Sequence, residues 1–293
     1  MGRASLALLA VVACGRESGT AVADGSDAGA TFAPSADASN LVECADRTKD
    51  PFVISEGYVL YSFHPTTLAF DEVGRIACNA GDAKPTSMAV DRRGTAWVRH
   101  SDGSIWKVST RDLTCTATTY VTLGPSYDFY QFGMGFSTDG TSGSSESLFL
   151  SDSNGAGLAR FDFPSMRVSP VGPYTGALAG KGAELTGTAD GRLYGFFVTI
   201  PAQLAEISKA NGAIISAKEL TNLVAGDAWA FSFHGGDFWF YTHDKPDGGT
   251  DDGGSDVTRY RPSDATITLV KPKVGFKIVG AGVSTCAPTQ AVR

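Results

Sequence analysis

A repeat of roughly 50 residues constrains the fold of this chain more than any other feature. One copy consists of three short segments rich in β-branched and aromatic residues, at 87–91, 94–98 and 104–109, with Gly, Asp and Ser between them. Short alternating segments separated by turn residues are typical of antiparallel strands. This copy therefore predicts a three-stranded meander, followed by a fourth strand over 115–123.

The same pattern recurs along the chain. Three later copies have their segments at 133–137, 147–150 and 157–161; at 184–188, 192–196 and 203–207; and at 229–233, 237–241 and 256–260. The apolar residue of the third segment falls at Phe63, Val108, Phe161, Ile207 and Tyr260, so that neighbouring copies lie 45 to 53 residues apart. Propeller blades of the kelch and WD types are roughly 40–50 residues long. The sequence therefore predicts an all-β chain folded as a β-propeller of five four-stranded blades.

The two ends of the repeat region complement each other. The copy around Phe63 has no inner-strand pattern before it, whereas residues 278–284 have an inner-strand pattern with no strand after them. If these parts pair, both termini together complete one blade, and no sheet edge of an open ring is left exposed. We expect the propeller to close in this way.

The N-terminus indicates export. Residues 1–3 include Arg3, and residues 4–13 form an apolar stretch of signal-peptide length that is shorter than the ~20 residues of a membrane-spanning helix. The sequence Val-Val-Ala-Cys at 11–14 resembles a bacterial lipobox, in which the cysteine thiol receives a diacylglycerol. We therefore predict a signal peptide over 1–13 and lipidation of Cys14. The alternative is an ordinary secretory signal in which Cys14 has no role.

The domain boundaries follow from composition. Residues 15–40 consist mostly of Ala, Gly, Ser, Thr and Asp with one aromatic residue, which is typical of a flexible linker. We predict a linker over 14–43, a propeller domain over 44–288 and a C-terminal tail over 289–293. Gly15 after the cysteine is not an Asp-type retention signal, so the expected location is the cell envelope, at the outer membrane.

The other four cysteines are Cys44, Cys78, Cys115 and Cys286. An even number of cysteines in an exported protein, without Cys-x-x-Cys spacing, favours disulfides. Three pairings are possible. Closure of the shared blade favours Cys44–Cys286, which leaves Cys78–Cys115 to join the first two blades; four free thiols are the alternative.

Charge limits the classes of partner. The formal net charge is −7, and the 24 Lys and Arg residues are scattered, so no basic stripe indicates nucleic-acid binding. We expect a monomer whose partners are the membrane, through the lipid, and an unknown protein or small-molecule ligand.

Motifs for catalysis and metal binding are mostly absent. No His-Glu-x-x-His motif is found, and no catalytic residue is assigned. The four histidines are His64, His100, His234 and His243. We expect each to lie at a turn or strand end of a different blade. We also expect each to be a turn or surface residue rather than a ligand. The acidic, glycine-rich run at 244–256 could supply oxygen ligands to calcium, but Asp and Gly clusters are also common in turns, and we favour a hairpin insertion.

The channel mouth is the place where a small ligand would contact several blades. The residues at the starts of the predicted inner strands are Thr86, Gln131, Glu184, Asp227 and Lys277, and Tyr130 lies in the loop that enters the third blade. We take Gln131, Glu184, Asp227, Lys277 and Tyr130 as candidate ligand-binding residues. The alternative is that all of them are solvated loop residues.

Two resemblances extend this interpretation. Residues 88–98, Met-Ala-Val-Asp-x-x-Gly-Thr-Ala-Trp-Val, resemble blades of NHL and gluconolactonase-type propellers. Stretches 88–118, 184–197, 228–240 and 259–288 resemble a family of uncharacterised propeller lipoproteins from myxobacteria, which brings no known activity.

The gluconolactonase resemblance implies Ca²⁺ or another divalent metal at the channel mouth, with Glu184, Asp227 and Gln131 as ligands of a lactonase-like hydrolase. Such enzymes usually have six blades rather than five. Shared metal ligation also requires the carboxylates of Glu184 and Asp227 to converge. We therefore predict a binding or scaffold module without cofactor, with the metal-dependent hydrolase as the alternative.

Overall fold

The computed structural model divides the chain into two units, residues 1–39 and 40–293. The structure describes residues 44–45, 47–141, 144–244 and 253–291. The predicted signal peptide, Cys14 and the predicted linker lie outside the described residues, as does most of the acidic run at 244–256. Within the described ranges, no helix has the length and apolar character needed to span a bilayer.

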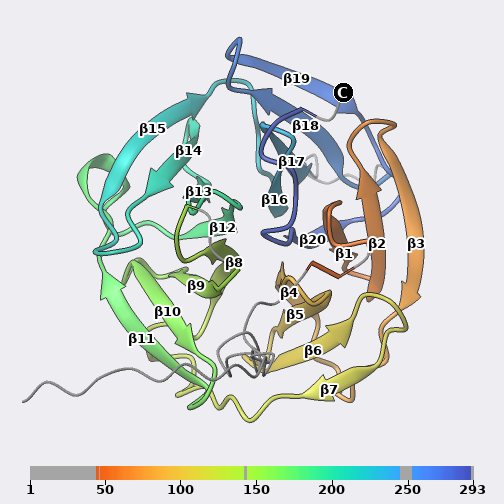
Figure 1. The fold of residues 1–293 in the computed structure, drawn as a ribbon, viewed down its shortest axis with the longest axis vertical. Helices are drawn as coiled ribbons and strands as arrows, with labels where there is room; N and C mark the ends of the chain where they lie inside the picture. The colour runs from red at the N-terminus through yellow and green to blue at the C-terminus, as the bar shows by residue number, and fades with distance from the viewer. Residues whose placement is uncertain (1–43, 46, 142–143, 245–252, 292–293) are drawn as a thin grey trace, which may run out of the picture. The chain divides into compact units, whose positions relative to one another are not determined.

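Residues 44–291 form a five-bladed β-propeller, and each blade is an antiparallel sheet of four strands (Figure 1). The closing blade contains β20 (Ile278–Gly282), β1 (Phe52–Ser55), β2 (Val59–His64) and β3 (Ala69–Arg75). The second blade contains β4 (Pro85–Val90), β5 (Thr95–His100), β6 (Ile105–Ser109) and β7 (Cys115–Ala117). The third blade contains β8 (Phe132–Thr138), β9 (Glu146–Asp152), β10 (Leu158–Asp162) and β11 (Arg167–Gly172). The fourth blade contains β12 (Ala183–Gly187), β13 (Leu193–Phe197), β14 (Ala202–Ile207) and β15 (Ile214–Leu220). The fifth blade contains β16 (Ala228–His234), β17 (Asp237–His243), β18 (Asp256–Arg261) and β19 (Thr266–Lys271).

Burial falls from the centre of the ring to its rim. Figure 1 shows β4, β8, β12, β16 and β20 innermost, and β8 and β12 are buried along their whole lengths. The outermost strands β11, β15 and β19 are mostly exposed or half-buried, which is why their sequences carry more polar residues. The inner strands are packed between neighbouring blades, which accounts for their high burial.

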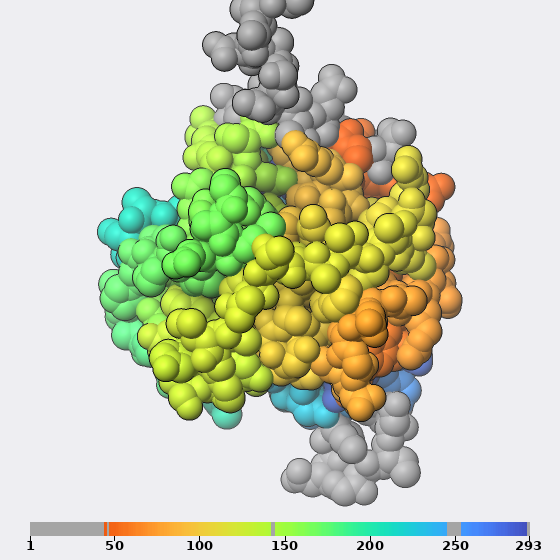
Figure 2. All heavy atoms as spheres, turned by 90° about the horizontal axis from the view of Figure 1, so that it is seen from below, coloured from red at the N-terminus to blue at the C-terminus, as the bar shows by residue number. Residues whose placement is uncertain are grey.

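The hydrophobic core is divided into five clusters, one between each pair of neighbouring blades. Aromatic rings dominate the cluster between the fourth and fifth blades, where Phe196 stacks edge-on against Phe240 at 4.8 Å between ring centroids. The others lie between the second and third, third and fourth, closing and second, and fifth and closing blades. Figure 2 shows from the side how the second blade fits between the closing blade and the third. Each blade thus has one apolar face toward each neighbour.

Glycines in the inner strands allow the blades to approach closely. A Cβ added to Gly133 in β8 would lie 2.3 Å from the carbonyl oxygen of Ala183 and 2.9 Å from Cδ of Glu184. A Cβ at Gly135 would lie 2.7 Å from the carbonyl oxygen of Leu185. The glycines that interrupt the apolar run of this strand are therefore required by the neighbouring strand β12.

The predicted closure by both termini is confirmed. Strand β1 pairs with β20 in antiparallel register, with Phe52 opposite Gly282 and Val53 opposite Ala281. Figure 1 shows the blue β20 beside the orange β1 near the centre of the ring. The first and last parts of the chain therefore share one sheet, and the ring has no open edge between them.

Both predicted disulfides are confirmed. Cys44 is bonded to Cys286 across 242 residues of sequence, and Cys78 is bonded to Cys115 across 37. The first bond ties the chain entering β1 to the chain leaving β20, and the second ties the closing blade to the second blade. Two disulfides are typical of proteins that fold outside the cytoplasm, in an extracellular or periplasmic compartment.

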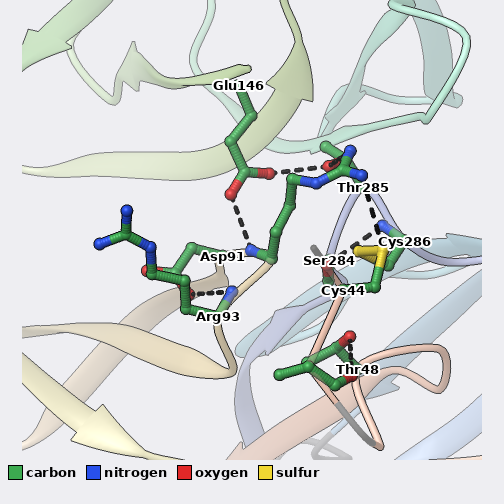
Figure 3. Close-up of a disulfide and its surroundings, with 10 residues drawn as sticks. Cys44, Thr48, Asp91, Arg93, Glu146, Ser284, Thr285 and Cys286 are labelled. Carbon is green, nitrogen blue, oxygen red and sulfur yellow. Dashed lines mark hydrogen bonds between the residues drawn. A yellow bond between two sulfur atoms is a disulfide. The ribbon is translucent and has the colours of Figure 1, made fainter. Parts of the chain in front are cut away.

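A half-buried carboxyl group lies near the first disulfide (Figure 3). One oxygen of Glu146 accepts a hydrogen bond from the backbone N–H of Arg92 at 2.7 Å, and the other accepts from the hydroxyl of Thr285 at 2.8 Å. Burial raises the pKa of Glu146 to about 7, and the two hydrogen bonds oppose this shift only in part. The group links the third blade to the turn after β4 and to the chain after β20.

Two expectations are wrong in detail. The fourth strand of the second blade spans only Cys115–Ala117 rather than 115–123, because the Thr118 hydroxyl bonds to the carbonyl of Ile105 and the chain then leaves the sheet. The histidines do lie at strand ends, but His100, His234 and His243 are buried at 1%, 6% and 3% exposure. His234 and His243 also share the fifth blade, because both ends of its first hairpin carry a histidine.

Candidate functional site

A cavity of about 430 Å³ lies where the inner strands begin, at one mouth of the central channel. All five residues taken from the starts of the inner strands line it, one from each blade: Thr86, Gln131, Glu184, Asp227 and Lys277. Thr86 and Glu184 are the second residues of β4 and β12 rather than loop residues. The sequence therefore located the residues around one mouth, while their role as ligand-binding residues stays a prediction.

Glu184 is the most buried of the five. It is 8% exposed, and one carboxyl oxygen accepts a hydrogen bond from the hydroxyl of Ser87 at 2.9 Å. Burial raises its pKa to about 8, although the Ser87 hydrogen bond and the positive charge of Arg99 both favour the ionised form. At neutral pH this carboxyl group is therefore mostly protonated, and it can donate as well as accept a hydrogen bond.

Arg99 supplies a buried positive charge to the same cavity. It is 2% exposed, and its guanidinium donates to the Thr86 hydroxyl at 2.5 Å and to the backbone carbonyl of Tyr130. The guanidinium carbon also lies 5.2 Å from the ring centre of Phe132. Burial lowers the pKa of Arg99, but an arginine side chain stays charged at any physiological pH.

The two lysines at the mouth are paired with carboxylates. Lys277 lies 2.9 Å from Asp227, and Lys84 lies 3.2 Å from Glu56. Asp227 also lies 2.6 Å from Nδ1 of His243, and this hydrogen bond and Lys277 together lower the pKa of Asp227 against the effect of burial. The rim therefore carries compensated ion pairs.

Several residues that line the cavity were not predicted from the sequence, and one predicted residue does not line it. Arg99, Lys84, Ser153 and Trp229 line the cavity, whereas Tyr130 does not and instead places its ring near the Arg99 guanidinium, at 5.8 Å. A signal for Arg99 was available. It lies two residues after the buried Trp97 in β5, on the same face of the strand, where a charged side chain needs a specific partner.

The predicted metal ligands do not form a metal-binding group. Asp227 is occupied by Lys277 and His243, while Glu184 bonds to Ser87. In the part of the chain that the structure describes, no group of three or more His, Cys, Asp and Glu side chains is placed to hold a metal ion. Metal binding by Glu184, Asp227 and Gln131 stays a prediction. The calcium site considered at 244–256 falls mostly outside the described residues.

No protein-family model and no curated protein matches the chain. Its fold is similar to solved structures at low identity. A protein of unknown function from Bacteroides caccae is 12% identical with a TM-score of 0.44, covering 79% of this chain and 97% of that one. A calcium-binding protein, regucalcin, from Agrobacterium tumefaciens is 15% identical with a TM-score of 0.43, covering 70% of this chain and 68% of that one. Neither similarity carries an argument about activity at these values.

Proposed function

We propose that the protein is a ligand-binding module of the bacterial cell envelope, held at the membrane by a lipid on Cys14. The observation that carries the binding role is the cavity of about 430 Å³, to which all five blades contribute a polar or charged side chain. This volume is in the range of small-molecule sites, roughly 300–1,000 Å³. We therefore assign binding.

The position of the first disulfide supports presentation of this site away from an anchor. The strand β20 runs across the ring from Lys277, at the mouth, to Gly282, and Cys286 follows it. Cys44 is bonded to Cys286, so the disulfide lies beyond the end of β20 that is away from the mouth. Figure 2 shows the first described residues (red) at the upper edge of the ring.

The anchor is tested by detergent phase separation. We expect the full-length protein produced in a bacterium to enter the detergent phase and the Cys14→Ala variant to stay in the aqueous phase, because ~0.8 kcal/mol of partitioning free energy is gained per buried CH₂ of an acyl chain. The Cys78→Ser/Cys115→Ser double variant is the control, since it alters two other cysteines and keeps the lipid. Equal partitioning of wild type and Cys14→Ala would show that no lipid is attached there. The resemblance to propeller lipoproteins and the lipobox-like segment motivate this test.

The binding role is tested by filling the mouth. Gln131 is exposed and lines the cavity, so Gln131→Trp adds volume there without removing a core side chain. Gln290→Trp, at an exposed position near Gly235 on the opposite face, is the matched control. We expect at least one member of a panel of small carboxylates, amines and neutral sugars to raise the melting temperature of wild type and of Gln290→Trp. The same compound should bind Gln131→Trp at least tenfold more weakly. A panel with no compound of this behaviour would reject a ligand site at the mouth.

A further inference from the structure

The charges at the mouth are balanced unevenly. Of the three cations that line the cavity, Lys84 and Lys277 each have a carboxylate within 3.2 Å. Arg99 has none within ion-pair distance among the residues that the structure describes, and its hydrogen-bond acceptors, Thr86 and the Tyr130 carbonyl, are both neutral. Its Nε is also buried and has no acceptor among these residues.

Three carboxyl groups line the cavity: Glu56 and Asp227 are paired with lysines, and Glu184 is in the wrong protonation state to neutralise Arg99. Its hydrogen bond goes to Ser87, not to the guanidinium, and its buried position keeps it mostly protonated at neutral pH. The other titratable groups that act on Arg99 include Asp102, in an exposed turn and hydrogen-bonded to Ser104, and Tyr120, whose pKa is raised by burial. A buried guanidinium without an anionic partner costs free energy that an anionic ligand would recover.

The remaining lining includes both apolar and polar side chains. Phe132, Trp229 and Val279 offer apolar surface, whereas Ser153 and Gln131 offer hydrogen-bonding groups. A planar guanidinium recognises a carboxylate through two parallel N–H donors.

We propose that the mouth binds a small organic carboxylate, with its carboxylate on Arg99 and its apolar body toward Trp229 and Phe132. This inference rests on the proposed binding function and specifies its ligand class. Because the protonated Glu184 is neutral, it leaves the charge of Arg99 available to the ligand. It can also donate a hydrogen bond to the bound anion.

The test compares each carboxylate with its amide. Benzoate and hexanoate are titrated into the full-length protein at pH 6.5 by ligand-observed NMR, beside benzamide and hexanamide, which have nearly the same shape without the charge. We expect at least one carboxylate to bind tenfold or more tightly than its amide. This preference should be lost in Arg99→Gln and partly kept in Arg99→Lys, which retains the charge without the two parallel donors.

A second measurement does not depend on the folding of the Arg99 variants. Raising the pH to 9.5 ionises Glu184 beside Arg99, so the preference of wild type for the carboxylate should fall about tenfold. Glu184→Gln cannot ionise, so whatever its preference for the carboxylate at pH 6.5, that preference should change less than twofold when the pH is raised to 9.5. Equal binding of carboxylate and amide, or no carboxylate binding while another compound binds at the mouth in the Gln131→Trp test, would overturn the carboxylate assignment and leave the ligand site intact. Failure of every compound in both tests would reject the site itself.

Discussion

Removing the Cys44–Cys286 disulfide is expected to lower the free energy of unfolding by about 2–5 kcal/mol. The bond joins residues 242 positions apart, so it closes nearly the whole propeller into one loop and restricts the unfolded chain accordingly. Chain-entropy reasoning gives about 5 kcal/mol for a loop of this size, and typical measured values are about 2–4 kcal/mol. The double variant Cys44→Ser/Cys286→Ser avoids leaving a free thiol.

Urea denaturation followed by tryptophan fluorescence measures this loss. The control is Cys78→Ser/Cys115→Ser, whose bond spans only 37 residues and should stabilise by about 4 kcal/mol in the same chain-entropy reasoning. We expect the larger loss of unfolding free energy in Cys44→Ser/Cys286→Ser, because the pairing between β1 and β20 is then the one direct link between the two ends of the ring. An unfolding midpoint of Cys44→Ser/Cys286→Ser equal to that of wild type would contradict the proposed role of this bond in closure.

The second large effect is a pH dependence of stability caused by Glu184. Its pKa is raised to about 8 in the folded protein from an ordinary value of 4.5, so between these values the native state holds one more proton than the unfolded state. Stability from this group is therefore fully present below about pH 4.5 and is lost as the pH rises toward 8. The slope is at most about 1.4 kcal/mol per pH unit.

Glu184→Gln removes this titration and keeps the size of the side chain and an oxygen for the Ser87 hydroxyl. As the pH is raised from 5 to 8, we expect the unfolding free energy of wild type to fall relative to that of Glu184→Gln. Comparing the two proteins cancels the contributions of Glu146, whose pKa of about 7 acts in the same direction, and of the buried histidines. Glu219→Gln, at an exposed position on β15, should show no such trend. A difference between Glu184→Gln and wild type that is constant with pH would mean that Glu184 is ionised in the folded protein.

The sequence predicted the architecture well because propeller blades repeat a local pattern. The third strand of each blade carries an apolar residue at the same position of the repeat. The unmatched inner strand at 278–284 could pair only with the incomplete N-terminal copy. The disulfide pairing followed from that closure. The length of β7 was overestimated, because the hydrogen bond between the Thr118 side chain and the neighbouring strand, where β7 ends, leaves no mark in the alternation of apolar residues.

The candidate site was predicted less completely, for a physical reason. The start of each inner strand gives one residue per blade, and these five do surround the mouth. The residues that set the electrostatics come from elsewhere. Arg99 is at the end of a second strand, and the Ser87 partner of Glu184 lies in another blade, 97 residues away in sequence. The pKa of Glu184 depends on this three-dimensional environment, so it could not be read from a position in the repeat.

The Cys44–Cys286 bond also determines how the propeller would respond to a mechanical pull on its N-terminal segment. Without the bond, tension entering at residue 51 would act on the end of β1 and could peel that strand from β20 one hydrogen bond at a time. With the bond, the load passes at Cys44 directly to Cys286, beyond the end of the inner strand β20. That strand is packed against β4 and β16 as well as paired with β1, so it resists as part of the whole ring. A tether attached here would transmit force to the propeller without unravelling its first blade.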